Sequence, residues 1–275
     1  EWAAANGYGD VSGIWDGFHQ YVLTNPNVDM RIGTTELPGT NGELVYMDLS
    51  AEDLGYPDSV RKYAAVDFTF QRAWDGVWMF NAAYTWSHNW GNNEGFVRSD
   101  NGQDDAGLTT LFDQPGLLDG AYGDLPNDRR HQVKMYGAYA VTEDLTLGAN
   151  LQFWTGKPVN AFGYHPTDKF AQAYDSESFY AGGELAPRGS RGRTSSYYSI
   201  DVSASYNIDI GEDQTLVVRA DVFNVLNNDK VTEVYEIYDS ESSQDPLDPD
   251  VDPNYGTPTQ WQTPRYVRFS VNYTF

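Results

Sequence analysis

Residues 265–275, RYVRFSVNYTF, alternate between two chemical classes up to the last residue of the chain. Apart from Arg265 at its start, the first class is apolar and contains Val267, Phe269, Val271, Tyr273 and Phe275; the second is mostly polar and contains Tyr266, Arg268, Ser270, Asn272 and Thr274. A β-strand places such alternate residues on opposite faces. About ten tilted residues is also the length that crosses the hydrocarbon layer of a membrane. The segment therefore predicts a transmembrane β-strand with one face toward lipid and one toward a wet lumen.

The composition fits this interpretation. The chain has 275 residues, a net charge of −23, eight Trp, twenty Tyr and no Cys. Its acidity argues against a nucleic acid partner, because phosphate binding needs a basic face. The lack of cysteine excludes disulfides and thiolate metal sites. No run of eighteen apolar residues occurs, so we expect no transmembrane helix. The chain begins at Glu1 without a leader-like segment, and we expect any signal peptide to have been removed or to lie upstream.

Six further segments alternate in the same way. They are residues 63–72, 77–88, 131–141, 145–154, 198–206 and 216–223. The phase of this alternation places the charged side chains Asp67, Lys134, Asp201, Arg219, Asp221 and Arg268 on the inner face. On the lipid face each would cost about 2–4 kcal/mol near the midplane. We expect these inner charges to pair with one another or with a plug rather than to bind substrate.

The connections alternate between short and long. Short turns are expected near residues 75, 143 and 211, and long polar stretches span residues 1–60, 89–129, 156–196 and 227–264. In bacterial outer-membrane barrels short turns face the periplasm and long loops face outside. We therefore divide the chain into an extracellular lead-in, residues 1–60, and a barrel segment, residues 61–275.

The number of predicted strands is odd. Single-chain bacterial barrels have even strand numbers, and unpaired strand edges do not persist in lipid. Either the lead-in hides an eighth strand, for which residues 42–49 are a weak candidate, or the chain is the C-terminal piece of a larger antiparallel, all-β transmembrane barrel. We favour the larger barrel.

Three motifs carry a resemblance. Residues 123–131 read GDLPNDRRH at the start of a strand, residues 155–158 read TGKP after a strand, and residues 219–227 read RADVFNVLN in the penultimate strand. In this order and spacing they resemble TonB-dependent outer-membrane receptors. The entry Arg61-Lys62-Tyr63 is similar to the Oar-like branch, which carries a carboxypeptidase-regulatory-like domain. The final residues Phe269, Val271, Tyr273 and Phe275 resemble the signal that the barrel-assembly machinery recognises.

The resemblance implies a barrel of about 22 strands in the bacterial outer membrane, of which this chain is the C-terminal portion. It implies ligand binding at extracellular loops and import across the membrane, with no catalysis and no cofactor. The implied partners are outer-membrane lipid, the N-terminal plug and remaining strands, the TonB complex acting through that missing part, and the barrel-assembly machinery. These residues contain no TonB box and no plug, so coupling to TonB is not encoded in them.

Two sets of residues are candidate binding sites. Among the loop aromatics, the expected ligand vestibule comprises Trp90, Phe96, Trp154, Tyr164 and Trp261, with Phe162, Phe170, Tyr174, Phe179 and Tyr180 as further members. The alternative is that these rings pack the loops together. No enzyme motif is present, since the four His are isolated from one another.

The acidic run contains the second candidate. Asp248, Asp250, Asp252 and Asn254 have the spacing of the first half of a calcium loop, but Pro253 stands where a Gly is needed. A solvated surface loop is the alternative interpretation. Two other function classes stay open: a small self-contained outer-membrane adhesin or structural barrel, and a secreted acidic β-protein that binds calcium or glycan.

Overall fold

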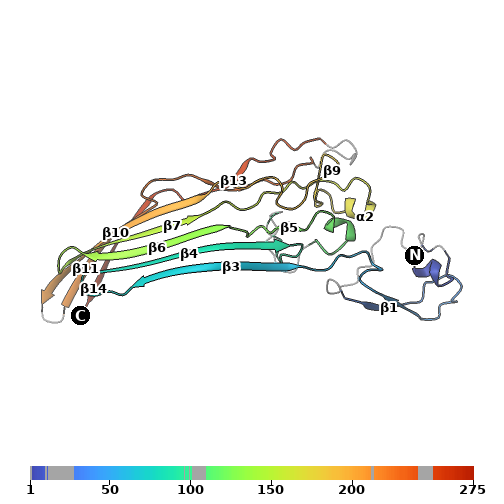
Figure 1. Ribbon diagram of the computed structural model, residues 1–275, viewed down its shortest axis with the longest axis horizontal. Helices are drawn as coiled ribbons and strands as arrows, with labels where there is room; N and C mark the ends of the chain where they lie inside the picture. The colour runs from blue at the N-terminus through green and yellow to red at the C-terminus, as the bar shows by residue number, and fades with distance from the viewer. Residues whose placement is uncertain are drawn as a thin grey trace.

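The chain forms one large antiparallel sheet with a layer of loops at one end (Figure 1), as seen in a computed structural model. The structure describes residues 2–9, 11, 28–95, 97–98, 100, 110–211, 214–240 and 250–275. The long strands are β3 (Arg61–Arg72), β4 (Trp78–Gly91), β6 (His131–Ala140), β7 (Leu145–Trp154), β10 (Tyr197–Gly211), β11 (Gln214–Phe223) and β14 (Tyr266–Thr274). They lie in the order β14-β11-β10-β7-β6-β4-β3, and the short β5 (Gly123–Asp124) pairs with the end of β4.

The strand register confirms the predicted phase of every strand. Directly opposed residues of an antiparallel pair share a face. One row across six strands is wholly apolar: Phe80, Gly137, Ala149, Val202, Val222 and Val267. A neighbouring row on the other face contains Ala138, Gly148, Ser203, Asp221 and Arg268. The sheet therefore has an apolar face and a polar face along its whole width.

The apolar face is left uncovered by the rest of the chain. Phe68 is 63% exposed and Phe269 is 77% exposed. A water-soluble sheet would bury such rings against a second layer. None of the helices in the described ranges has the length and apolar character that a membrane crossing requires.

The short turns lie at the end of the sheet opposite the loops. In the first turn, Asp75 Oδ1 accepts hydrogen bonds from the backbone N–H groups of Val77 and Trp78, both at 2.9 Å. In the second, Thr142 Oγ1 accepts from Leu145 N at 3.0 Å. The third predicted turn includes residues 212 and 213, which lie outside the described residues. β10 continues to Gly211, beyond its predicted end at 206, because residues 207–209 keep pairing with β11.

The lead-in contains a hairpin that alternation did not reveal. β1 (Met30–Thr34) pairs with β2 (Val45–Leu49) in a sheet of its own, beyond the loop layer in Figure 1. The candidate eighth strand, residues 42–49, thus overlaps β2, which pairs with β1 and does not join the large sheet. A short helix, α1 (Trp2–Ala5), precedes the hairpin.

The loop layer consists of the described parts of residues 92–130, 155–196 and 224–265. It contains the 3-10 helix η1 (Pro115–Leu118), the helix α2 (Lys169–Gln172) and two hairpins, β8 (Tyr180–Ala181) with β9 (Glu184–Leu185) and β12 (Val231–Val234) with β13 (Pro258–Trp261). Unlike the sheet, the layer has a buried core, formed by Leu111, Leu118, Ala121, Phe162 and Phe179. The loops therefore form a packed unit over the end of the sheet.

Candidate functional site

Two buried arginines hold the first two loops together. The side chains of Arg98 and Arg188 are both 0% exposed. Asp100 bridges them, with Oδ1 3.1 Å from Arg98 Nε and Oδ2 2.9 Å from Arg188 Nη1. Glu177 pairs with Arg98 at 2.8 Å, and Glu94 pairs with Arg188 at 3.1 Å. Burial raises the pKa of the Glu94 carboxyl, with the negative charge of Asp100 as a further cause.

The aromatic rings of the core cover these cations. The Arg98 guanidinium lies 4.6 Å from the ring centre of Phe162, and that of Arg188 lies 4.7 Å from Phe179. Phe162 and Phe179 are themselves fully buried and contact each other at 5.2 Å. These two rings therefore serve the packing of the loops, which is the alternative stated for them from the sequence.

The DRRH motif fastens the loop layer to the strand ends. The fully buried Asp128 accepts a hydrogen bond from Asn89 N at 2.7 Å and pairs with Arg130 at 2.7 Å and with Arg193. Asp124 pairs with the same two arginines, each at 2.8 Å. These arginines are among the causes that lower the pKa of the Asp124 carboxyl, although burial opposes them as the largest single effect. The motif thus has a structural function at the junction of sheet and loops.

A buried carboxylate joins the second and third loops. Glu236 is 5% exposed, and its Oε2 accepts hydrogen bonds from the Asn160 backbone N–H at 2.9 Å and side-chain amide at 2.8 Å. The same amide of Asn160 also donates to Asp100 at 3.2 Å, so this residue links all three loops. Burial raises the pKa of Glu236 to about 7.

The TGKP motif belongs to the same junction. A Cβ atom added to Gly156 would lie 1.8 Å from the carbonyl oxygen of Thr194, so only glycine allows the two chain segments to approach there. Lys157 donates from Nζ to Glu233 at 2.9 Å.

On the polar face, three of the six predicted inner charges, Arg219, Asp221 and Arg268, pair with one another. The carboxylates of Asp67 and Asp201 accept hydrogen bonds from neutral groups. Asp221 accepts from Arg219 Nε at 2.8 Å and from Arg268 Nη2 at 3.0 Å, and its side chain is 5% exposed. Asp201 accepts from Asn150 Nδ2 at 3.1 Å and from the backbone N–H of Asn224 at 2.8 Å. These contacts lie next to a hollow of about 330 Å³ on this face.

In the last part of the RADVFNVLN motif, Asn224 has a structural function. Its φ is 47°, in the left-handed region that Asn tolerates better than most residues. Its side-chain amide donates to the carbonyl oxygens of Asn228 at 2.8 Å and Thr263 at 2.9 Å. Asn227 also has a positive φ, of 53°. These two left-handed residues form a turn that ends β11 at the loop layer.

The described members of the proposed vestibule occupy different places. Trp154 stacks on Tyr197 at 4.0 Å on the polar face, with the Arg129 guanidinium 5.7 Å from its ring. Trp90 stacks on His88 at 4.2 Å and is opposite Lys62 in the register, which places it in phase with the apolar face. Tyr164 lies in the second loop, where its N–H donates to Asp239 at 3.0 Å. Trp261, on β13, is 57% exposed.

These four rings lie at the loop end of the molecule, but no ring contact joins any two of them within the described residues. Phe96 lies outside the described residues. Of the further candidates, Phe170 is 59% exposed, Tyr174 is half-buried, and Tyr180 contacts His165 at 4.6 Å. The vestibule stays a prediction.

The calcium candidate is only partly covered, because Asp248 lies outside the described residues. Asp252 Oδ1 accepts a hydrogen bond from Asn254 N at 2.7 Å, and Asp250 O accepts from Ser240 N at 2.8 Å. Over the described ranges, the Asp, Glu and His side chains form no group of three that could hold a metal ion.

The sequence pattern did not identify the buried charges. Arg98 and Glu177 are 79 residues apart, and Asp100 and Arg188 are 88 apart. Polar segments rich in charge predict solvent-exposed loops, and no sequence periodicity connects such distant positions. The one local signal was the i, i+2 spacing of Arg98 and Asp100, which is too common to indicate a buried pair.

Comparisons with known proteins agree with the motifs. No family model matches the chain. It is 31% identical over 253 residues to the TonB-dependent transporter Oar of Myxococcus xanthus, which covers 80% of this chain. The chain spans 23% of the length of that relative.

Two solved receptors are similar at 12% identity. For the ferric-catecholate import receptor Fiu of E. coli K12, the aligned region covers 84% of this chain and 22% of the receptor chain, with a TM-score of 0.41. For FpvA of P. aeruginosa, bound to iron pyoverdine, the aligned region covers 90% of this chain and 23% of the receptor chain, with a TM-score of 0.43.

Proposed function

Because this chain is related to the TonB-dependent transporters, we propose that it forms part of the wall and the outer loops of a transport barrel in the bacterial outer membrane. In this proposal the chain forms part of the barrel and binds ligand, and it catalyses no reaction. The relative that supports this proposal is a transporter and not an enzyme.

The observation that carries the proposal is the two-faced sheet. Apolar rows run across the long strands on one face, and rows with paired charges run across the other. A barrel wall between lipid and a wet lumen needs this arrangement. The edge strands β3 and β14 have one strand neighbour each in the described sheet, so further strands on both sides would close the barrel. The N-terminal hairpin β1–β2 does not supply one, which disfavours a small self-contained barrel.

We assign ligand capture to the loop layer and to the end of the polar face that adjoins it. The stacked Trp154 and Tyr197 share the polar face, which the proposal assigns to the lumen, and Trp261 is exposed on β13 in the third loop. Phe96 and Tyr164 are the other proposed contacts, whereas Trp90, in phase with the apolar face, is not part of this proposed surface. The rigid ion-pair core beneath them would hold such a surface in shape without ordering costs on binding.

The partners follow from the same proposal. A plug domain and the remaining strands would complete the barrel, TonB would act through the plug, and lipid would cover the apolar face. Phe275, 90% exposed at the short-turn end, would be available to the barrel-assembly machinery together with Phe269, Val271 and Tyr273.

Two measurements on the full-length protein test this function. First, the protein should fractionate with the outer membrane and migrate differently on gels before and after heating, as folded barrels do. Second, loss of this protein and loss of TonB should impair growth on the same nutrient. A monomer that stays folded and soluble without detergent would refute the barrel, and a growth defect that is independent of TonB would refute the coupled transport.

A further inference from the structure

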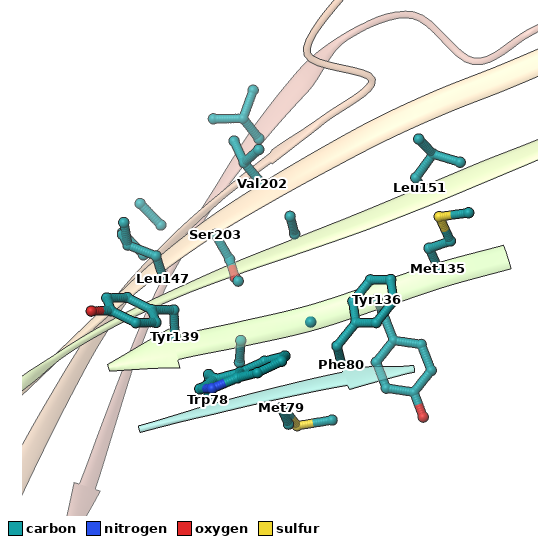
Figure 2. A pocket seen from close by; sticks show the side chains of 17 residues that line it. Trp78, Met79, Phe80, Met135, Tyr136, Tyr139, Leu147, Leu151, Val202 and Ser203 are labelled. Carbon is teal, nitrogen blue, oxygen red and sulfur yellow. The ribbon is translucent and has the colours of Figure 1, made fainter. Parts of the chain in front are cut away.

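The apolar face of the sheet contains a hollow of about 970 Å³ that spans five strands (Figure 2). Its volume is within the range of small-molecule pockets, roughly 300–1,000 Å³. Small residues form its floor, since Gly137 is opposite Ala149 and Ala204 is opposite Ala220 in the register. Gly137 is required there: a Cβ atom would lie 2.9 Å from the carbonyl oxygen of Met79 and 3.3 Å from the ring of Phe80.

Large side chains border this floor at both ends. Trp78, Tyr139 and Leu147 form one cross-strand row on the side of the short turns, and Met135 and Leu151 face each other toward the loops, as Figure 2 shows. Amphipathic rings such as those of Trp78 and Tyr139 favour the level of lipid headgroups. The hollow is therefore apolar along its length and has an aromatic border where the proposed membrane meets the periplasm.

A cation lies at this aromatic border. Arg72, the last residue of β3, is opposite Phe80 and so shares the apolar face. Its guanidinium lies 4.0 Å from the ring centre of Trp78 and pairs with Asp75, whose carboxylate also caps the turn. The Nε–H of Arg72 is buried without an acceptor among the described residues, while 38% of the side chain is exposed. The guanidinium is thus held at headgroup depth, and its exposed part, not the buried Nε–H, is the part that a phosphate can reach.

We propose that this hollow binds one phospholipid of the periplasmic leaflet, with an acyl chain along the small-residue floor and the phosphate at Arg72. The inference rests on the proposed function, because that function places the apolar face in the membrane. An arginine matches a phosphate through paired N–H donors. A protein occupant would meet no row of hydrogen-bonding groups on this floor, whereas a hydrocarbon chain needs none. The opposite, polar face is the one available to a plug, so the plug does not compete for the hollow.

The first test fills the hollow. Full-length protein, extracted from outer membranes in mild detergent, is titrated with phosphatidylglycerol and the bound lipids are counted by native mass spectrometry. The double variant Ala149→Phe/Ala204→Phe should bind the first lipid about tenfold more weakly, because excluding about two methylene groups changes a dissociation constant by about that factor. The matched control is Val66→Phe, which adds the same ring on the apolar face outside the hollow. Ala220→Leu is a smaller change that should act in the same direction.

The second test separates the headgroup from the chain. Arg72→Gln should weaken phosphatidylglycerol several-fold and leave diacylglycerol, which lacks the phosphate, unchanged. Equal lipid binding by the filled variants and the Val66→Phe control would overturn the proposal. A change of oligomeric state on filling, with lipid binding unchanged, would identify a protein interface and overturn it too. Variants that still migrate as folded barrels leave the proposed function intact in either case, whereas failure of the unmodified protein to fold as a barrel refutes the function itself.

Discussion

The sheet and the loop layer differ in which side chains they expose and which they bury. In the sheet, large apolar side chains stay on the surface: Phe68 and Phe269 are 63% and 77% exposed. In the loop layer, charged side chains are inside: Arg98, Asp128 and Asp239 are 0% exposed.

Under the proposed function, the two regions are adapted to different solvents. The sheet satisfies its backbone by strand pairing and leaves its apolar face for lipid, which makes it stable only where lipid is present. The loop layer, in water, closes over its own core and fixes long polar segments with paired charges. Paired buried charges give geometric definition more than net stability, and removal of one partner is strongly destabilising.

The largest expected effect tests the loop layer. Arg98→Met removes the Arg98 ion pairs of Asp100 and Glu177, and we expect a loss of about 3–5 kcal/mol in the local stability of the layer. Hydrogen exchange at the paired amides of Gly163 and Ser178 would measure it. The control is Arg31→Met, since the Arg31–Asp48 pair is exposed on both sides and is worth about 0–1 kcal/mol. If both variants behave alike, the buried pairs do not hold the loops.

The next effect tests the sheet. Val202→Arg places a charge on the apolar face near the middle of β10 and should cost about 2–4 kcal/mol in a bilayer. Ser203→Arg, one residue along on the polar face, should be nearly neutral. Urea unfolding of the full-length protein in lipid vesicles compares them. Equal losses would show that the two faces do not have different solvents.

A pH-dependent effect distinguishes the two regions further. Burial raises the pKa of Glu236 from 4.5 to about 7, so between these values the folded state binds more protons than the unfolded state. The stability of the junction should therefore fall as pH rises through this window, by up to about 3 kcal/mol. Glu236→Gln should remove this dependence. At high pH the junction of the variant should be more protected from hydrogen exchange than that of the unmodified protein, and at low pH the two should be similar. Exchange of the Asn160 amide reports it, and an unchanged pH profile in the variant would contradict the assignment.

The smallest effect lies where sheet and loops meet. Asn224→Gly keeps the left-handed backbone but removes the side-chain hydrogen bonds, with an expected loss of about 1 kcal/mol. Asn224→Ala should cost about 1 kcal/mol more, because alanine is strained at a positive φ. Thermal unfolding of both variants in the same detergent measures the difference. If the alanine variant is no less stable than the glycine variant, backbone strain does not explain this residue.

The sequence predicted the sheet better than the loops for a physical reason. Alternation along Val77–His88 or Leu145–Trp154 is local, and one register connects all strands once each phase is known. Of the hairpin β1–β2, the strand Val45–Leu49 lies within the weak candidate 42–49, whereas Met30–Thr34 was not predicted, because five residues place only two or three side chains on each face. The motifs marked positions but not partners: nothing near Asp128 in the sequence indicates Arg193. Contacts between distant loop residues, such as Arg98 and Glu177, have no periodic signal at all.

The most direct test of the two-faced wall uses the absence of cysteine from these 275 residues, with any cysteine elsewhere in the full-length protein replaced first. Single cysteines are introduced in turn at residues 199–206 of β10 in the full-length protein and exposed, in outer membranes, to a water-soluble thiol reagent and to a lipid-soluble one. We predict a period of two: positions 199, 201, 203 and 205 react from the aqueous lumen, and positions 200, 202, 204 and 206 react only with the lipid-soluble reagent. Uniform reactivity along the strand would contradict the account.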